Sequence, residues 1–142
     1  MILEELNYTT IHGVSVYIPF FDRITVIGGD SSSGKSFVKD TAKEAYNDIG
    51  VRIIEVFDYS SPVDLDMLKN LSGRLIIMDN ADIFLRNDLD LRTHINRDGR
   101  NQYLLFMRTE NGIDASADNY AELHEEGLLR VDKKLIAYYP YR

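Results

Sequence analysis

The chain has 142 residues, of which 44% are hydrophobic and 27% are charged, and this balance is typical of one globular domain spanning residues 1–142. The absence of cysteine excludes disulfides, thiolate metal sites and cysteine nucleophiles. A formal net charge of −7 argues against nucleic acid as a partner, because binding to a phosphate backbone needs a basic face.

The N-terminal residues 1–10, MILEELNYTT, carry acid rather than base before a short apolar stretch, which is not the pattern of a signal peptide. The chain also has no apolar run of about 18 residues, the length that a membrane-spanning helix needs. We therefore expect a cytoplasmic protein without a membrane partner.

The first predicted elements are two extended segments within residues 14–27, VSVYIPFFDRITVI. The first segment alternates apolar and polar residues, a turn is expected at 21–23, and the β-branched run 24–27 predicts a buried strand. From Lys35 onward, apolar residues recur at spacings of three and four, which predicts a helix that ends at Gly50.

Three more strands are predicted at 51–59, 74–79 and 101–108. The second helix is expected to begin with Ser61 as its N-cap and to end at Gly73, and a polar helical region is expected through 81–97. This alternation of strands and helices indicates a parallel α/β layout. The remaining segment, from residue 120, is predicted to form a short helix and then a hairpin that turns near 132–134.

A phosphate-binding pattern lies between the buried strand and the first helix. Gly29, Gly34, Lys35 and Ser36 match GxxxxGK[ST], the Walker A motif. In such a loop the backbone N–H groups point toward phosphate oxygens, and the positive end of the following helix adds to their field. A strand-to-helix turn that is merely rich in Gly and Ser is the alternative. The predicted nucleotide-binding residues are Gly29, Asp30, Ser31, Ser32, Ser33, Gly34, Lys35, Ser36 and Phe37.

The motif predicts a role for each of its polar side chains. Lys35 would reach the β- and γ-phosphates, and the Ser36 hydroxyl would ligate Mg²⁺. A second motif supports this hypothesis, because the strand LIIMD ends at Asp79, where P-loop proteins have the acid that holds Mg²⁺, usually through water. The predicted metal ligands are therefore Ser36 and Asp79.

With both motifs in place, the chain resembles the P-loop NTPases, in particular the additional-strand branch that includes the AAA+, ABC and STAND-type ATPases. The resemblance covers roughly residues 14–109. It implies a three-layer α/β core with a mostly parallel sheet in the order 5-1-4-3-2, an antiparallel N-terminal lead-in strand and a C-terminal hairpin. It also implies ATP and Mg²⁺ as cofactors, a protein partner or a homo-oligomer, and a γ-phosphate sensor at the tip of the fourth strand, either Arg108 or Thr109.

The chain departs from this family pattern directly after Asp79. Those ATPases commonly have a Glu at the next position to activate the attacking water, whereas this chain has Asn80, and an amide cannot take the proton. General-base help contributes on the order of 10² to 10⁴ in rate, so we expect slow hydrolysis. Asp82 and Glu110 are the acids best placed to substitute.

Three functions fit these residues. The first is a small ATPase in which Lys35, Asp79, Asp82 and Arg108 are the catalytic residues. The second is a nucleotide-gated protein-interaction module with negligible turnover, and the third is a small-molecule kinase in which RTHINRDGR (92–100) imitates a lid. The arginines between the Walker B strand and the fourth strand are either candidates for an arginine finger or a solvated basic face. They are Arg86, Arg92, Arg97 and Arg100. The chain has no NKxD motif, which favours ATP over GTP.

Overall fold

The computed structural model describes residues 1–10, 13–28, 38, 40–42, 44, 53–58, 60–108, 112–126 and 134–142. Within these residues the strands are β1 (Glu5–Thr9), β2 (Ser15–Pro19), β3 (Ile24–Ile27), β4 (Ile54–Phe57), β5 (Leu75–Met78), β6 (Gln102–Phe106), β7 (Tyr120–Glu126) and β8 (Lys134–Tyr138). The helices are α2 (Leu65–Lys69), α3 (Ala81–Leu85), α4 (Leu89–Arg97) and the 3₁₀ helix η1 (Ala117–Asn119). Residues 38, 40–42 and 44 are also helical.

The eight described strands form one sheet in the order β1-β2-β8-β7-β3-β6-β5-β4. Strands β7, β3, β6, β5 and β4 are parallel to their neighbours in this order. In the other half, β1 pairs antiparallel with β2, β2 pairs parallel with β8, and β8 pairs antiparallel with β7. The sheet is therefore mixed.

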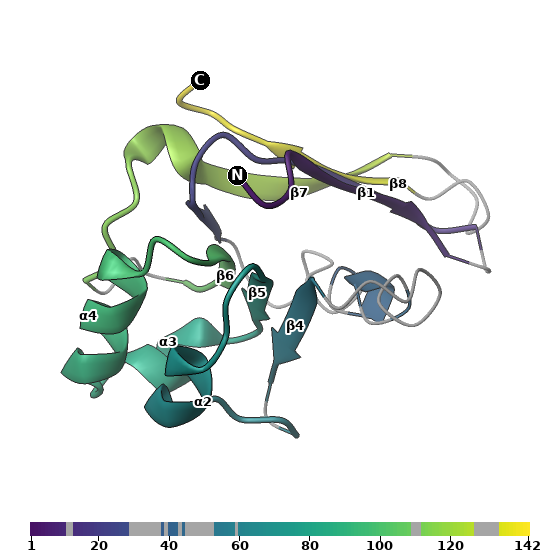
Figure 1. Ribbon diagram of the computed structural model, residues 1–142. Coiled ribbons are helices and arrows are strands. Elements are labelled where there is room, and N and C mark those ends of the chain that lie inside the picture. The colour runs from purple at the N-terminus through teal and green to yellow at the C-terminus, as the bar shows by residue number, and fades with distance from the viewer. Residues whose placement is uncertain are drawn as a thin grey trace.

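Strand β7 belongs to both halves of the sheet. Its first residues pair with β3, where Val26 faces Tyr120 and Ile27 faces Ala121, and the rest of β7 pairs with β8. Because β3 ends at Ile27, β7 continues beyond it, and the sheet curls there into a half-barrel. In Figure 1, β1, β7 and β8 lie across the top of the molecule, while α2, α3 and α4 gather below the parallel strands.

The core has two hydrophobic clusters, one on each face of the parallel half. The first includes Ile27, Ile77 and Phe106, which pack with residues of β1, β2, β7 and β8 and with the helical residues Val38 and Ala42. The second joins the opposite face of the same strands to α2, α3 and α4. The residues of the second cluster from the helices include Leu68, Leu85, Leu91 and Ile95.

The predicted fold class, a three-layer P-loop core, is therefore wrong. The structure has a strongly curled mixed sheet of eight described strands with few helices, and the β1-β2-β8-β7 half of that sheet packs over one face of the parallel strands. The predicted lead-in strand, β2, pairs with β1 and β8 rather than with the strand that follows it. Its antiparallel partner β1 comes from the N-terminal residues, for which no strand is predicted from the sequence.

The helix predicted from residue 120 is also wrong, because Tyr120–Glu126 is strand β7. Along this segment the buried residues Ala121 and Leu123 alternate with the exposed Glu122 and His124, which is the two-residue period of a strand. The strands predicted within 14–27, 51–59, 74–79 and 101–108 are confirmed as β2, β3, β4, β5 and β6. The polar helical region is two helices, because α3 ends at Leu85 and α4 begins at Leu89.

Candidate functional site

The carboxyl ends of β3, β6 and β5 meet at one edge of the sheet, because β6 lies between the other two strands and is parallel to both. Backbone hydrogen bonds hold these ends in register. Met107 N donates to Ile27 O at 3.2 Å, and Asp79 N donates to Phe57 O at 3.0 Å. Gly28 directly follows β3, and its N donates to Ala121 O at 3.0 Å. The next residue of the chain is Gly29, the first residue of the Walker A pattern.

The connections that leave β3 and β6 at this edge run toward opposite sides of the sheet. After β3 the chain leads to β4, on the far side of β6 and β5, whereas after β6 it leads to β7, on the other side of β3. In open parallel sheets such a switch point, outside the carboxyl ends of the strands, is where ligands bind. The two ends are in ordinary van der Waals contact, because a Cβ added to Gly28 would lie 3.9 Å from Met107 O.

The predicted phosphate-binding residues lie outside the described part of the chain. They are Gly29, Asp30, Ser31, Ser32, Ser33, Gly34, Lys35, Ser36 and Phe37. The same holds for Thr109 and Glu110, the alternative sensor and the alternative base. The roles of these residues stay predictions.

Asp79 and Asn80 form the turn from β5 into α3. Asp79 is half-buried, and Asn80 is exposed with φ 50° and ψ 48°, which is the left-handed conformation. Asn tolerates this conformation better than most residues that have a Cβ. The side chain of Asn80 makes no capping hydrogen bond to α3. The residue that follows Asp79 thus serves the backbone turn.

Asp82 and Arg108, predicted separately as candidate catalytic residues, are brought together. Asp82 lies in the first turn of α3 with 9% of its surface exposed. Its Oδ2 accepts a hydrogen bond from the backbone N of Arg108 at 2.6 Å, while the Arg108 side chain is exposed. The carboxylate therefore contacts the backbone at the end of β6.

Asp58 is a third acid at the same edge, and the sequence reasoning missed it. It follows β4, is 4% exposed, and accepts hydrogen bonds from Ser60 N, Ser60 Oγ and Ser61 N at 2.7–2.9 Å. Its signal is an acid directly after an apolar strand, the same pattern that singled out Asp79. These hydrogen bonds stabilise the turn between β4 and α2.

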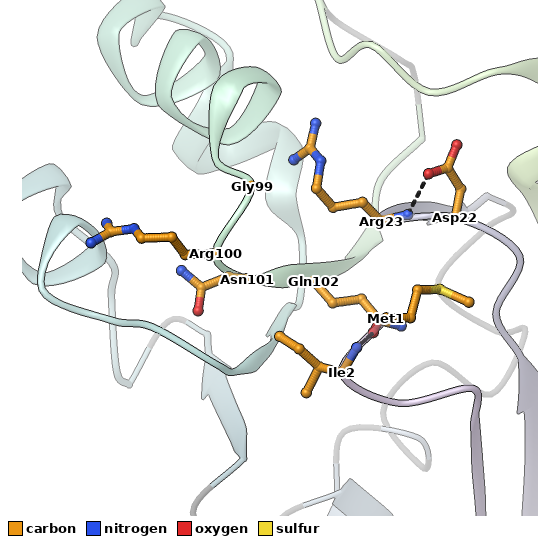
Figure 2. Close-up of a pocket in the computed structure, with 8 residues that line it drawn as sticks. All are labelled: Met1, Ile2, Asp22, Arg23, Gly99, Arg100, Asn101 and Gln102. Carbon is orange, nitrogen blue, oxygen red and sulfur yellow. Dashed lines mark hydrogen bonds between the residues drawn. The ribbon is translucent and has the colours of Figure 1, made fainter.

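A pocket of about 300 Å³ lies at the opposite, amino edge of the parallel strands (Figure 2). Its polar side chains are engaged within the protein. Arg23 donates to Ile95 O at 2.6 Å and to Asn96 O at 2.8 Å, and the Gln102 amide bonds the N-terminal backbone at Ile2 and Leu3. The residues that line the pocket are Met1, Ile2, Asp22, Arg23, Gly99, Arg100, Asn101 and Gln102.

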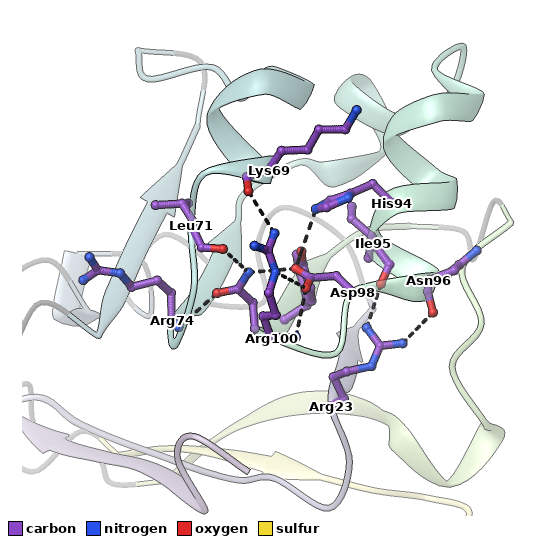
Figure 3. Close-up of polar contacts among 11 residues, drawn as sticks. Arg23, Lys69, Leu71, Arg74, His94, Ile95, Asn96, Asp98 and Arg100 are labelled. Atoms are coloured by element: carbon purple, nitrogen blue, oxygen red, sulfur yellow. Dashed lines mark hydrogen bonds and ion pairs between the residues drawn. The ribbon is translucent and has the colours of Figure 1, made fainter.

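The same edge holds a buried polar cluster around Asp98 (Figure 3). Its carboxylate accepts hydrogen bonds from Tyr103 Oη at 2.6 Å, Asn101 Nδ2 at 2.7 Å and Arg100 N at 2.9 Å, and His94 Nε2 lies 3.7 Å away. Burial raises the pKa of Asp98. The hydrogen bonds from Tyr103, Asn101 and Arg100 lower the pKa by a larger amount, so it lies below its usual value. This cluster ties the end of α4 to the start of β6.

The predicted kinase lid, residues 92–100, forms most of α4 and its connection to β6. Arg100, one of the arginine-finger candidates, donates to Lys69 O at 2.8 Å and lies 3.7 Å from Asp98 Oδ1. Since Arg100 precedes β6 and Arg108 follows it, these two arginines are at opposite edges of the sheet.

Within the described ranges, no group of three or more His, Asp or Glu side chains could hold a metal ion. The predicted pair of Ser36 and Asp79 is not covered by this finding, because Ser36 is not described. In the same part of the chain, no helix is long and apolar enough to cross a membrane.

Comparisons with family models, with curated proteins and with solved structures found no match. The resemblance to P-loop NTPases therefore stays a prediction from the two motifs.

Proposed function

We propose that the chain binds Mg-ATP at the carboxyl edge of β3, β6 and β5 and hydrolyses it slowly. The observation that carries this proposal is the parallel register of these strands, which sets Gly28, Asp79 and Arg108 at one edge. The GxxxxGK[ST] pattern begins one residue after Gly28, at a switch point of the kind where α/β sheets bind ligands. Motif and topology thus point to the same edge independently.

Each candidate residue has a definite task in this proposal. The backbone N–H groups of Gly29–Ser36 would hold the phosphates, and Lys35 would neutralise the β- and γ-phosphates. Ser36 and Asp79 would hold Mg²⁺, for which hydroxyl and carboxylate oxygens are suitable ligands. Asp79 fits this task because it is half-buried at the end of β5.

Slow turnover is proposed because Asn80 and Asp82, the candidate proton acceptors near Asp79 that the structure describes, are poorly suited to that role. Asn80 carries an amide, and Oδ2 of Asp82 already accepts the N–H of Arg108. The same observation favours the second candidate function, a nucleotide-gated interaction module with negligible turnover. The two candidates share the nucleotide site and differ only in phosphate release.

Calorimetric titration with Mg-ATP tests the shared site. We expect the wild type to bind with one site per chain and Lys35→Ala to bind at least about tenfold more weakly, because a charge-assisted contact to phosphate is lost. Lys134→Ala is the matched control, since Lys134 is an exposed lysine on β8 and its loss should leave the affinity unchanged. Asp79→Asn should reduce the gain in affinity that Mg²⁺ gives. A wild type that binds no Mg-ATP would contradict the proposal.

Phosphate release on the same samples then separates the two candidates. Release that Lys35→Ala abolishes would identify an ATPase, and a specific rate that rises with protein concentration would indicate a site completed by a second copy. Binding without release would identify the interaction module.

A further inference from the structure

We infer that Asp82 is a positioning residue, which holds the end of β6 so that the Arg108 side chain is directed toward the γ-phosphate of a bound nucleotide. This inference rests on the proposed function, and it gives Asp82 a different role from the general base that the sequence suggests.

The geometry of the contact favours positioning. Asp82 Oδ2 lies 2.6 Å from Arg108 N, across 26 residues of sequence, and only 9% of the Asp82 surface is exposed. A short hydrogen bond from an amide to a carboxylate that is shielded from water is among the stronger hydrogen bonds in proteins. The contact therefore constrains the backbone of Arg108.

The acid itself is held rigidly by its helix. Asp82 O accepts a hydrogen bond from Arg86 N at 2.9 Å, and the neighbouring Ala81 and Leu85 are completely buried in the cluster that contains Leu105 and Met107 of the β6 segment. Asp82 is thus fixed relative to the strand whose end it contacts.

The end of β6 needs such a partner because β5 does not continue beside it. Met78 of β5 faces Leu105, and the chain turns away at Asn80 into α3. Met107 N still bonds β3, through Ile27 O, and the next amide, Arg108 N, bonds the Asp82 carboxylate instead of a strand. The carboxylate thus takes the place of the missing strand backbone.

The position of this backbone matters because it carries the exposed Arg108 side chain, which ends in the guanidinium. A guanidinium binds phosphate oxygens through a planar fork of N–H groups, so its contribution depends on orientation. A contact to the γ-phosphate would strengthen binding of ATP and not of ADP. The preference for Mg-ATP over Mg-ADP is therefore the property that Asp82 controls through Arg108.

The test uses calorimetric affinities for Mg-ATP and Mg-ADP in Asp82→Ala, Asp82→Asn, Arg108→Ala and the double variant Asp82→Ala/Arg108→Ala. We expect Arg108→Ala to lower the ATP-to-ADP preference by about tenfold, and Asp82→Ala to lower it by a similar factor. The double variant should be no worse than either single variant, because both act through one contact. Asp82→Asn should keep the preference within about threefold, since its amide oxygen can accept the same N–H.

Phosphate release provides the readout that distinguishes the two roles. A positioning Asp82 predicts that Asp82→Asn keeps most of the wild-type rate, whereas a general base predicts a loss on the order of 10² or more. Such a loss with an unchanged ATP preference would overturn the inference, as would an unchanged preference in Asp82→Ala or additive effects in the double variant. If Asp82→Ala does not fold, Asp82→Asn and Arg108→Ala still decide the question. Failure of the wild type to bind any nucleotide would instead refute the proposed function.

Discussion

Among single residues, Asp98 makes the clearest pH-dependent contribution to stability. Burial raises the pKa of its carboxyl, but the hydrogen bonds from Tyr103, Asn101 and Arg100 outweigh burial, so the pKa lies below its usual value. A lowered pKa stabilises the folded protein above the unfolded-state pKa, and this stabilisation is lost as the pH falls through the folded-state value. We expect the free energy of unfolding in urea to depend less steeply on pH below about pH 4 in Asp98→Asn than in the wild type. Asp66→Asn, at an exposed position, is the control, and an unchanged slope in Asp98→Asn would contradict this account.

The hydrogen bond from Tyr103 is the shortest of those that the Asp98 carboxylate accepts. The Tyr103 side chain is completely buried, and its hydroxyl donates to Asp98 Oδ2 at 2.6 Å. We expect Tyr103→Phe to lower the free energy of unfolding by about 2 kcal/mol, because a hydrogen bond to a charged group is lost. Chemical denaturation at neutral pH measures this value, and a cost below about 0.5 kcal/mol would show that the bond contributes little.

The left-handed backbone conformation at residue 80 explains why an asparagine occupies this position. Its positive φ predicts that Asn80→Ala lowers the free energy of unfolding by about 1 kcal/mol, whereas Asn80→Gly leaves it nearly unchanged. Urea denaturation of both variants checks this difference. Equal stability of the two variants would mean that the left-handed conformation is not maintained in solution.

The sequence identifies Asp82 and Arg108 as candidates but not their contact. The first lies in the turn after β5 and the second at the end of β6, so their distance depends on the register between two strands. That register pairs Met78 with Leu105, and because every residue of both strands is buried, no alternation of apolar and polar residues specifies it.

Among the secondary-structure elements, the start of α2 shows how a neighbouring element shifts a helix boundary. Ser61 is the predicted N-cap, and the observed cap is Asp64, whose side chain accepts from Met67 N at 2.8 Å. Both residue types are good caps, but the carbonyl of Ser61, which would accept the first hydrogen bond of a helix starting there, accepts instead from Asp58 N at 3.1 Å in the turn after β4. The turn thus delays the helix by three residues.

This assignment predicts that Asp64→Ala lowers the free energy of unfolding by about 1 kcal/mol, because an N-cap hydrogen bond is lost. Ser61→Ala is the matched control and should cost clearly less. Thermal or urea unfolding of the two variants measures the difference, and the reverse order would show that the helix starts at Ser61 in solution.

Strand β7 shows where local pattern fails. YAELHEE contains Ala, Glu and Leu, which favour helices, yet it pairs with β3 on one side and with β8 on the other. The continuous apolar runs of β3 and β5 have no such ambiguity, because four consecutive buried residues fit a strand between two neighbours. Tertiary pairing therefore decides the conformation of β7, whereas local sequence is sufficient for β3 and β5.

For the whole molecule, the strand order depends on the C-terminal residues. Strand β8 lies between β2 and β7, and Tyr139 after it is buried against the N-terminal segment, where its hydroxyl donates to Pro19 O and its ring lies edge-on to Phe21 at 5.0 Å. The sequence patterns that resemble Walker A and Walker B contain no information about these contacts. The architecture predicted from the motifs is wrong for this reason, although the buried strands are located correctly.

The position of β8 predicts the effect of truncation. Deletion of residues 134–142 should abolish cooperative unfolding, because it separates the β1-β2 pair from the rest of the sheet. Arg142→Ala is the control, and it should cost only about 1 kcal/mol, since it removes the contact of the guanidinium with the Phe21 ring at 3.8 Å. Urea denaturation followed by circular dichroism tests both. A cooperative transition in the truncated protein would contradict the central place of β8.

The central claim is that Mg-ATP binds at the carboxyl edge of β3, β6 and β5, and hydrogen exchange with and without Mg-ATP tests it most directly. We predict slower amide exchange in residues 28–37, in residues 79–82 and at Arg108, with no change around Arg23 and Arg100, which line the pocket at the amino edge. Protection at that pocket instead, or no protection at saturating Mg-ATP, would contradict the claim.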